Sequence, residues 1–407
     1  MRNEIELPRL SIAERDRRWA ETRKTMREKG LDCLVLWGWP AFWDFHTANA
    51  RYLCPIGGNS ENNVLIFPLN GEPTSFVLMP TFVEYWKRSQ NWVSDVRARE
   101  KSWAETVVRR LKELKLDRAS IGMDGSAGPL DSDGWLPRSV YDGVLSGLPE
   151  VRFVNLDDDL EMMRSIKSAE EIAMLERAAS LGDGMLQACI ENARPGVRET
   201  EVYSAMMHAM LSEGGEEPTL FLWACDQYPF PHPFRLPAMR RMESRDIIVC
   251  EIHPKIGGYF THVERTFCLG EPDQNTQRIY DGCVAAFDRG MELFAPGAPI
   301  AETLNEVKKV VDQAGLGICE LGIHGHGLAS LEYPRYRFHA LAGDQAALKR
   351  SGDMFVPGMV FAFNIDLFDP QWRNGETGAV FAETIHITKS GARYMHRFPH
   401  ELQRIPI

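Results

Sequence analysis

Several acidic and histidine side chains interrupt stretches of this chain that are otherwise apolar. Glu251 follows IIVC in the segment DIIVCEIHPKIGGYFTHVERTF, residues 246–267, and His262 comes eleven residues after it. His326 lies between two glycines, where close approach of the backbone is expected, and Glu383 lies within the apolar run AVFAETIHI. An unpaired charge is costly in apolar surroundings, so these groups need a partner. Histidine and carboxylate side chains in such places bind divalent metal ions or transfer protons.

The second half of the chain contains the helices and strands that must position these residues. Ser168, followed three residues later by Glu171, forms a capping-box pattern that predicts the start of a long helix. Its buried face carries Ile172, Leu175, Ala178, Met185 and Cys189. Further helices are predicted at 199–213, 274–293 and 301–314, and strands at 218–224, 246–252, 258–268, 358–366 and 379–388. This helix–helix–strand order occurs twice and predicts a pseudo-symmetric α+β domain.

The first half of the chain alternates between helical and strand patterns, which predicts an α/β domain over residues 1–158. Helices are expected at 13–29 and 103–114, strands at 33–37, 119–123 and 151–154, and a hairpin around Asn70-Gly71. The acidic run at 157–159 is predicted to be a solvated linker. A second domain then covers residues 159–407.

Bulk composition narrows the class of protein. A chain of 407 residues is long enough for two domains with ample core. Its net charge of −11 argues against nucleic acid and anionic membrane surfaces as partners. We find neither an apolar run long enough to span a bilayer nor a signal-peptide core at the start, and the eight scattered cysteines fit buried, reduced thiols. We therefore expect a cytoplasmic enzyme with a small-molecule substrate.

Five segments, in order, resemble the pita-bread superfamily of methionine aminopeptidase, prolidase, aminopeptidase P and creatinase. They are RSIKSAEEI, GGYFTHVERTF, GIHGHGLASLEYP, VPGMVFAFN and FAETIHIT. Together they cover roughly residues 160–400. The resemblance implies a pita-bread catalytic domain after an N-terminal domain of the creatinase and prolidase type. It also implies a homodimer in which the N-terminal domain of one subunit lies near the partner's active site.

The resemblance implies five metal-ligand positions, three of which are changed in this chain. They correspond to Glu251, His262, His326, Asn364 and Glu383, and a supporting family histidine corresponds to Leu331. The peptidases carry four carboxylates and one histidine there, which neutralise two divalent ions. Glu251 and Glu383 supply only two negative charges. A dinuclear centre is therefore not expected, and one divalent ion is the most that this balance suits.

The first of two alternatives is a metal-free, creatinase-like site. Its support is Tyr259 with the segment Glu264-Arg265-Thr266, which resembles creatinase, whereas the peptidases carry threonine at Glu264. The catalytic residues are then predicted to be His232, Glu264, His326 and Glu383, with His232 as acid and base. The residues predicted to bind the substrate are Glu251, Arg335 and Asn364, with Arg335 holding a carboxylate.

The second alternative is a site for one ion. His262, His326 and Glu383, with Glu251 as a fourth ligand, form a set that suits iron, manganese or zinc with an open position. Such a site supports hydrolysis or a lyase reaction.

The prediction from sequence is a creatinase-like hydrolase that cleaves a non-peptide C–N bond of a small zwitterionic or cationic compound. The alternatives are a single-metal hydrolase or lyase, and a metal-dependent Xaa-Pro dipeptidase or aminopeptidase. A non-catalytic binding module is a further class, which the retained histidines and glutamates disfavour.

Overall fold

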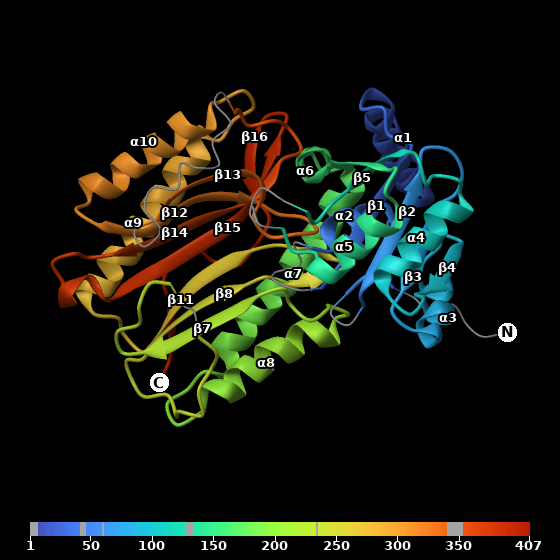
Figure 1. Ribbon diagram of the computed structural model, residues 1–407. Coiled ribbons are helices and arrows are strands. Elements are labelled where there is room, and N and C mark those ends of the chain that lie inside the picture. Colours follow the sequence, from blue (N-terminus) through green and yellow to red (C-terminus); the bar gives the residue numbers. More distant parts are fainter. Residues whose placement is uncertain (1–6, 41–45, 59–60, 127–133, 233–234, 340–352) are drawn as a thin grey trace. The chain divides into compact units, whose positions relative to one another are not determined.

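The computed structural model describes residues 7–40, 46–58, 61–126, 134–232, 235–339 and 353–407 (Figure 1). The chain divides into two compact units, Met1–Arg164 and Ser165–Ile407. In the part of the chain described, no helix is long and apolar enough to cross a membrane. The mixed α/β character predicted from the sequence is confirmed in both units.

The first unit is built on a six-stranded mixed sheet with the order β4-β3-β2-β1-β5-β6. Its strands are β1 Cys33–Gly38, β2 Asn63–Pro68, β3 Thr74–Val77, β4 Asp95–Ala98, β5 Ser120–Met123 and β6 Arg152–Asn155. Its helices are α1 Ile12–Glu28, α2 Ala48–Leu53, α3 Pro80–Ser89, α4 Trp103–Glu113 and α5 Arg138–Gly147. Central β1 pairs antiparallel with β2 and parallel with β5, and the apolar side chains of α4 pack into the core beside it.

The acidic run at 157–159 is not the solvated linker that its charge suggests. It forms the first turn of α6, Asp157–Ser165, where carboxylates face the positive end of the helix dipole. Asp157 is buried and accepts hydrogen bonds from the backbone N–H of Gly125 (3.3 Å) and from the Asn155 amide (2.9 Å).

The second unit is a nine-stranded sheet with helices packed against it (Figure 1). Its main strands are β7 Phe221–Asp226, β8 Ile247–Ile252, β11 Val263–Leu269, β12 Gly317–Gly325, β13 Glu332–His339, β14 Val360–Phe368 and β15 Gly378–Thr388. The short strands are β9 Lys255–Ile256, β10 Tyr259–Phe260, β16 Gly391–Tyr394 and β17 Gln403–Ile405. The helices are α7 Ala169–Asn192, α8 Glu199–Ser212, α9 Gln274–Leu293 and α10 Ile300–Gln313, and a short 3₁₀ helix covers Arg373–Gly375.

The strand order β13-β12-β14-β15-β11-β8-β7 brings the two halves of this unit together at β15 and β11. In Figure 1, α7 and α8 lie beside β7 and β8, whereas α9 and α10 lie beside β12 to β15. This arrangement is the predicted repetition of a helix–helix–strand pattern.

Helix α9 covers one face of β14 and β15 and so determines which side chains face the other way. The ring of Phe287 lies 5.0 Å from that of Phe381 and 6.1 Å from that of Phe363. Directly opposed residues of antiparallel strands share a face, and successive residues alternate between faces. Asn364 and Ala382, which pair with each other, therefore point away from α9.

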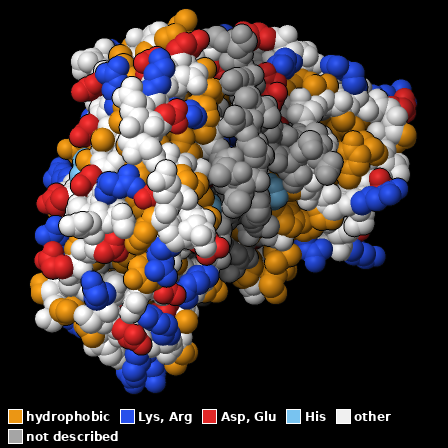
Figure 2. All heavy atoms as spheres, turned by 90° about the vertical axis from the view of Figure 1, so that its left-hand side faces the viewer, with side chains coloured by type: hydrophobic (Ala, Val, Ile, Leu, Met, Phe, Trp, Pro, Cys, Tyr) orange, Lys and Arg blue, Asp and Glu red, His pale blue; other side chains and the backbone are white. Residues whose placement is uncertain are grey.

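The surface of the protein mixes charges of both signs. Figure 2 shows basic and acidic side chains interspersed on one face of the molecule. Exposed pairs such as Lys308–Asp312 and Lys309–Glu306 of α10 have this pattern.

Candidate active site

Strand register in the second unit gathers acidic and histidine side chains on the face that points away from α9. Glu264 of β11 is opposed by Glu251 of β8 on one side and by Ala382 of β15 on the other. His324 of β12 is opposed by Ala362 and Arg335. These pairs place side chains from β8, β11 and β12 toward one volume.

A break between β10 and β11 fixes His262 within this group. The sequence predicted a single strand over 258–268, but the ladder is interrupted at Thr261 and His262. The His262 N–H donates to the Thr384 hydroxyl oxygen, and that hydroxyl donates to the His262 carbonyl, both over 2.8 Å. The backbone at His262 is thus held by a side chain of β15.

The closest contacts in the group connect Glu251, His253 and His262. His253 Nε2 lies 3.2 Å from Glu251 Oε1 and 3.1 Å from His262 Nδ1. The ring of His326 is 5.2 Å from that of His253 and 5.5 Å from that of His262. The ring of His324 is 4.8 Å from that of His326. All five side chains are buried.

Several donor and acceptor atoms in this group lack a hydrogen bond within the described residues. They are both ring nitrogens of His326, Nε2 of His262, Nδ1 of His253, Nδ1 of His324 and both carboxylate oxygens of Glu264. His262 Nε2 and Glu264 Oε1 are 3.3 Å apart without hydrogen-bond alignment. Leaving buried polar atoms without a partner costs free energy, so these atoms require a bonding partner that the described residues do not supply.

The group fits a divalent metal ion. One ligand atom each from His253, His262 and His326 lies within 4.8 Å of the others, and the same holds for Glu251, His262 and Glu264. Burial lowers the pKa of His262 and of His326, so both imidazoles are neutral and carry a lone pair that a metal ion can accept. Neutral imidazoles with two carboxylates balance one divalent charge.

The two glutamates of the group have opposite proton affinities. Burial by itself raises the pKa of Glu251, but the hydrogen bond with His253 and the nearby histidines outweigh it and bring the pKa to about 2. Burial, reinforced by the carboxylates of Asp366 and Glu251, raises the pKa of Glu264 well above its ordinary value. The surroundings therefore favour the charged form of Glu251 and the neutral form of Glu264.

A buried ion pair supports the loop that carries His326. Lys167 Nζ lies 3.1 Å from Glu332 Oε2, and each side chain is 1% exposed. A Cβ on Gly327 would lie 3.0 Å from both Glu332 Oε2 and Lys167 Cε, and one on Gly325 would lie 2.4 Å from the Tyr333 carbonyl oxygen. The close approach predicted from the glycines around His326 is confirmed.

Comparison with known proteins assigns the family. The model of metallopeptidase family M24 matches residues 173–389, and the creatinase/prolidase N-terminal domain matches residues 18–166. The chain belongs to metallopeptidase family M24. This membership confirms the pita-bread superfamily and a hydrolase, and it implies use of a divalent metal ion.

Relatives of this M24 member are named as peptidases. The Xaa-Pro dipeptidase of Pyrococcus furiosus is 26% identical over 276 residues, which are 67% of this chain and 75% of the relative. The probable dipeptidase PepE of Mycobacterium tuberculosis H37Rv is 28% identical over 257 residues, 61% and 63% of the two chains. The structure of an X-Pro aminopeptidase from Thermotoga maritima has a TM-score of 0.76 at 16% identity, covering 96% of this chain and 99% of that one.

These names contradict the function predicted from sequence. A creatinase-like hydrolase that cleaves a non-peptide C–N bond was expected because of the Glu264-Arg265-Thr266 segment and the reduced negative charge at the metal-ligand positions. The relatives are instead named Xaa-Pro dipeptidase, prolidase and dipeptidase, which act on peptide bonds. A three-residue match within one strand was too small a basis for choosing a substrate class.

The structure does not bring Glu383 to the histidine group of this M24 domain. Glu383 pairs with Phe363, so it lies on the face of the sheet that α9 covers. There its Oε1 forms an ion pair with the buried Arg265 guanidinium and lies 3.5 Å from His400 Nε2. Its pKa, which burial alone would raise, is lowered by Arg265. Ala382 occupies the neighbouring position on the histidine side.

The other predicted residues lie on the histidine side of the M24 sheet or next to it. Asn364 is buried between Gly322 and Ala382, and Arg335 is opposed by His324. His232, which lies in the segment after β7, places Nδ1 2.8 Å from Asp366 Oδ2.

Three residues of the group were not among the predicted site residues. His253 and His324 each stand two residues from a predicted one, Glu251 and His326, and so share a strand face with it. Asp366 likewise stands two residues after Asn364 in an apolar strand. The alternation of side chains along a strand was the signal that could have found all three.

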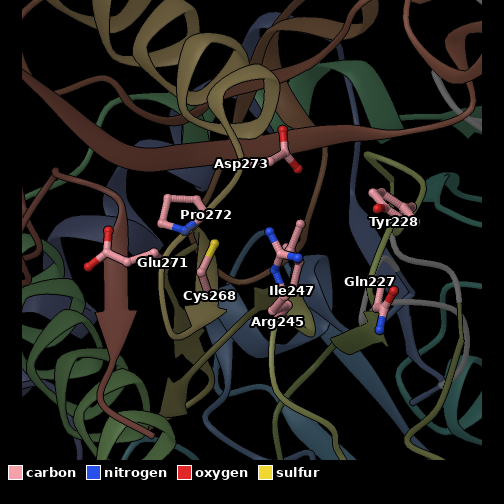
Figure 3. Close-up of a pocket in the computed structure, with 8 residues that line it drawn as sticks. All are labelled: Gln227, Tyr228, Arg245, Ile247, Cys268, Glu271, Pro272 and Asp273. Atoms are coloured by element: carbon pink, nitrogen blue, oxygen red, sulfur yellow. The ribbon is translucent and has the colours of Figure 1, made fainter.

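A small pocket elsewhere in this unit has different chemistry. It has a volume of about 50 Å³ and is lined by Gln227, Tyr228, Arg245, Ile247, Cys268, Glu271, Pro272 and Asp273 (Figure 3). It contains no histidine, and Asp273 caps the start of α9. The histidine group, rather than this pocket, has the composition of a catalytic site.

Proposed function

We propose that this M24 member is a metal-dependent peptidase that hydrolyses a peptide bond in short peptides, with Xaa-Pro dipeptides as its first candidate substrates. The observation that carries the proposal is the buried group of His253, His262, His326 and Glu251, whose donor atoms converge within a metallopeptidase domain. The names of the relatives support the substrate class.

The proposed ligands are Glu251, His253, His262 and His326. Three imidazoles and one carboxylate suit zinc, iron or manganese with a position left for substrate. Bound there, a divalent ion supplies a Lewis acid that polarises the scissile carbonyl. Glu383 is absent from this set because it faces α9 and neutralises Arg265.

Two residues next to the ligands are proposed to move protons. Glu264 accepts a proton from the attacking water, and the raised pKa of its carboxyl group makes its carboxylate a stronger base than that of an exposed glutamate. His232 donates a proton to the leaving nitrogen. Both residues are buried, so these transfers take place away from bulk water.

Arg335 is proposed to bind the C-terminal carboxylate of the substrate. It is opposed by His324 across β12 and β13, so its side chain extends from the histidine side of the sheet. A guanidinium group binds a carboxylate with two parallel hydrogen bonds, which distinguishes a dipeptide from its amide. Asn364, on the same face, is a further residue proposed to contact substrate.

The cellular setting is also a proposal. All eight cysteines are buried and free, which supports a reducing compartment such as the cytoplasm. The homodimer, with the N-terminal domain of one subunit near the partner's active site, remains a prediction from the resemblance.

The test combines metal analysis with a peptide panel. Purified protein is loaded with zinc, manganese or iron, and hydrolysis of Ala-Pro, Leu-Pro, Ala-Ala and Gly-Gly is measured. We expect one ion per chain and cleavage of at least one dipeptide.

Two histidine variants distinguish loss of a metal ligand from a general effect of removing any histidine. His253→Ala should lose the ion and the activity, whereas His208→Ala, an exposed histidine of α8, should keep both. The proposal fails if no metal-loaded sample cleaves any peptide. Retention of a full equivalent of metal by His253→Ala would remove His253 from the ligand set.

A further inference from the structure

The pair of His232 and Asp366 is the feature of the candidate site that neither the family pattern nor the ligand set explains. His232 Nδ1 lies 2.8 Å from Asp366 Oδ2, and the two side chains are 6% and 0% exposed. Hydrogen bonds of this length in such burial hold an imidazole in one orientation.

The backbone around His232 is fixed as well. The Gly378 N–H donates to the Pro229 carbonyl over 3.2 Å, and the Thr377 hydroxyl donates to the Tyr228 carbonyl over 3.5 Å. A Cβ on Gly378 would lie 2.6 Å from Pro231 Cβ, so this glycine permits the segment to pack on the first residue of β15. The segment thus presents His232 to β14 from a defined position.

Asp366 lies on the face of the sheet that carries the histidine group. It stands two residues after Asn364 in β14 and is opposed by Val380 and Glu320. Its Oδ1 makes no hydrogen bond within the described residues. One oxygen therefore holds His232, while the other remains in the acidic interior.

A charged carboxylate at position 366 does not contribute to the stability of the fold. Burial and the carboxylates of Glu320 and Glu251 raise the pKa of Asp366, whereas its interaction with Glu264 lowers it. Its Oδ2 bonds to a histidine ring rather than to a permanently charged arginine or lysine. An asparagine amide could accept from Nδ1–H or donate to a bare Nδ1, whereas a carboxylate can only accept, so an aspartate selects one tautomer of His232.

We propose that Asp366 is the positioning residue of His232: it accepts the Nδ1–H hydrogen bond, fixes that tautomer, and makes Nε2 the atom that gives a proton to the leaving nitrogen. This role rests on the proposed peptidase function. It deepens that function by naming the group that orients the acid.

The proton balance of the step is complete without a further reactant. Water gives one proton to Glu264, and its oxygen bonds to the carbonyl carbon. The C–N bond breaks with its electron pair on nitrogen, which receives a proton from Nε2 of His232. Transfer of the proton on Glu264 back to His232 restores both residues, and Asp366 takes no part in the proton transfers.

The first experiment reads the tautomer directly. Protein labelled with ¹⁵N-histidine is observed by NMR, and the His232 signals are assigned by their loss in His232→Gln. In the wild type we expect Nδ1 protonated and Nε2 carrying the lone pair when the ring is neutral. Asp366→Asn should shift the population toward the Nε2–H tautomer, because the amide can donate to Nδ1. Glu320→Gln removes a neighbouring charge without touching His232 and should leave the tautomer unchanged.

The second experiment reads catalysis. Asp366→Asn should lower kcat by roughly 10²–10⁴-fold, the range known for loss of an orienting aspartate, with KM changed by less than about threefold. In a His232→Gln background, Asp366→Asn should lower kcat by less than about threefold further, because the aspartate acts through the histidine.

The outcomes separate this inference from the proposed function. An unchanged His232 tautomer in Asp366→Asn overturns the inference whatever the activity. The inference is also overturned if Asp366→Asn lowers kcat by the same factor in the wild type and in the His232→Gln variant. If the wild type cleaves no peptide, the proposed function fails, while the tautomer measurement still decides whether Asp366 orients His232. If Asp366→Asn does not fold, Asp366→Glu, which keeps the charge but moves it by one methylene, must retain the wild-type tautomer.

Discussion

The buried pair of Lys167 and Glu332 allows a quantitative test of how this fold supports its ligands. Both side chains are 1% exposed, and the nitrogen–oxygen distance is 3.1 Å. Glu332 Oε1 also accepts the Ala329 N–H over 3.2 Å. Lys167→Met removes the cation of this pair and leaves the Glu332 carboxylate in the interior.

The expected loss follows from the desolvation of an unpaired charge. Breaking one partner of a buried ion pair costs about 3–5 kcal/mol, and a unit of this size changes its Tm by about 2–4 °C per kcal/mol. Lys167→Met should therefore lower the Tm by about 6–20 °C. The double variant Lys167→Met/Glu332→Leu removes both charges and should recover most of this loss, because apolar replacements of a buried pair are often neutral.

An exposed pair of equal length is the matched control. Arg138 and Asp142 are also 3.1 Å apart, but their side chains are 92% and 58% exposed. Arg138→Met should change stability by less than about 1 kcal/mol, since solvent screens such pairs.

The assay is calorimetric unfolding of chelator-treated protein, followed by metal analysis of each variant. Gly327, which follows His326 in the chain, packs on this ion pair. Lys167→Met should therefore also bind the divalent metal ion of the proposed site less tightly. The reasoning is refuted if Lys167→Met unfolds within about 2 °C of the wild type. It is equally refuted if the double variant loses as much as the two single variants combined.

Three further predictions concern the carboxylates and Arg335. Glu264→Gln in chelator-treated protein should raise the Tm more at pH 8 than at pH 4. The folded-state pKa of Glu264 is raised above its ordinary 4.5. The wild type therefore has its full stability below pH 4.5 and loses stability as the pH rises through the raised pKa. Equal shifts at both pH values would contradict this sign. Glu383→Gln should keep one equivalent of metal but lose about 3–5 kcal/mol of stability, because it leaves Arg265 buried without an anion; metal loss at normal stability would place Glu383 among the ligands after all. Arg335→Gln should raise KM for a dipeptide by about 10–100-fold and leave KM for the dipeptide amide unchanged, as measured by product release; equal effects on both substrates would exclude a carboxylate contact.

Local sequence patterns predicted most of the fold. Ser168 and Glu171 form the expected capping box, with side chain and backbone bonded in both directions. The turn signal at Asn70-Gly71 lies between β2 and β3, which pair antiparallel. These patterns succeed because a cap or a turn is determined by residues close together in the chain.

The candidate site was less predictable because it depends on cross-strand register. Glu251, His262 and His326 lie in one buried group, and their role there stays a prediction. A one-residue difference in β15 decides whether Ala382 or Glu383 faces them, and the apolar composition of that strand gives no hint of the choice. The partnership of His232 with Asp366 connects positions 134 residues apart, which no local pattern records.

The neighbours Asn364 and Ala382 also bear on how much negative charge the candidate site carries. They face each other across β14 and β15, and Ala382 lies beside Glu264. Two point substitutions, Asn364→Glu and Ala382→Glu, would add two negative charges to the acidic and histidine side chains without altering any strand. The charge of the candidate site can therefore be changed at these two positions without a change in the backbone that carries them.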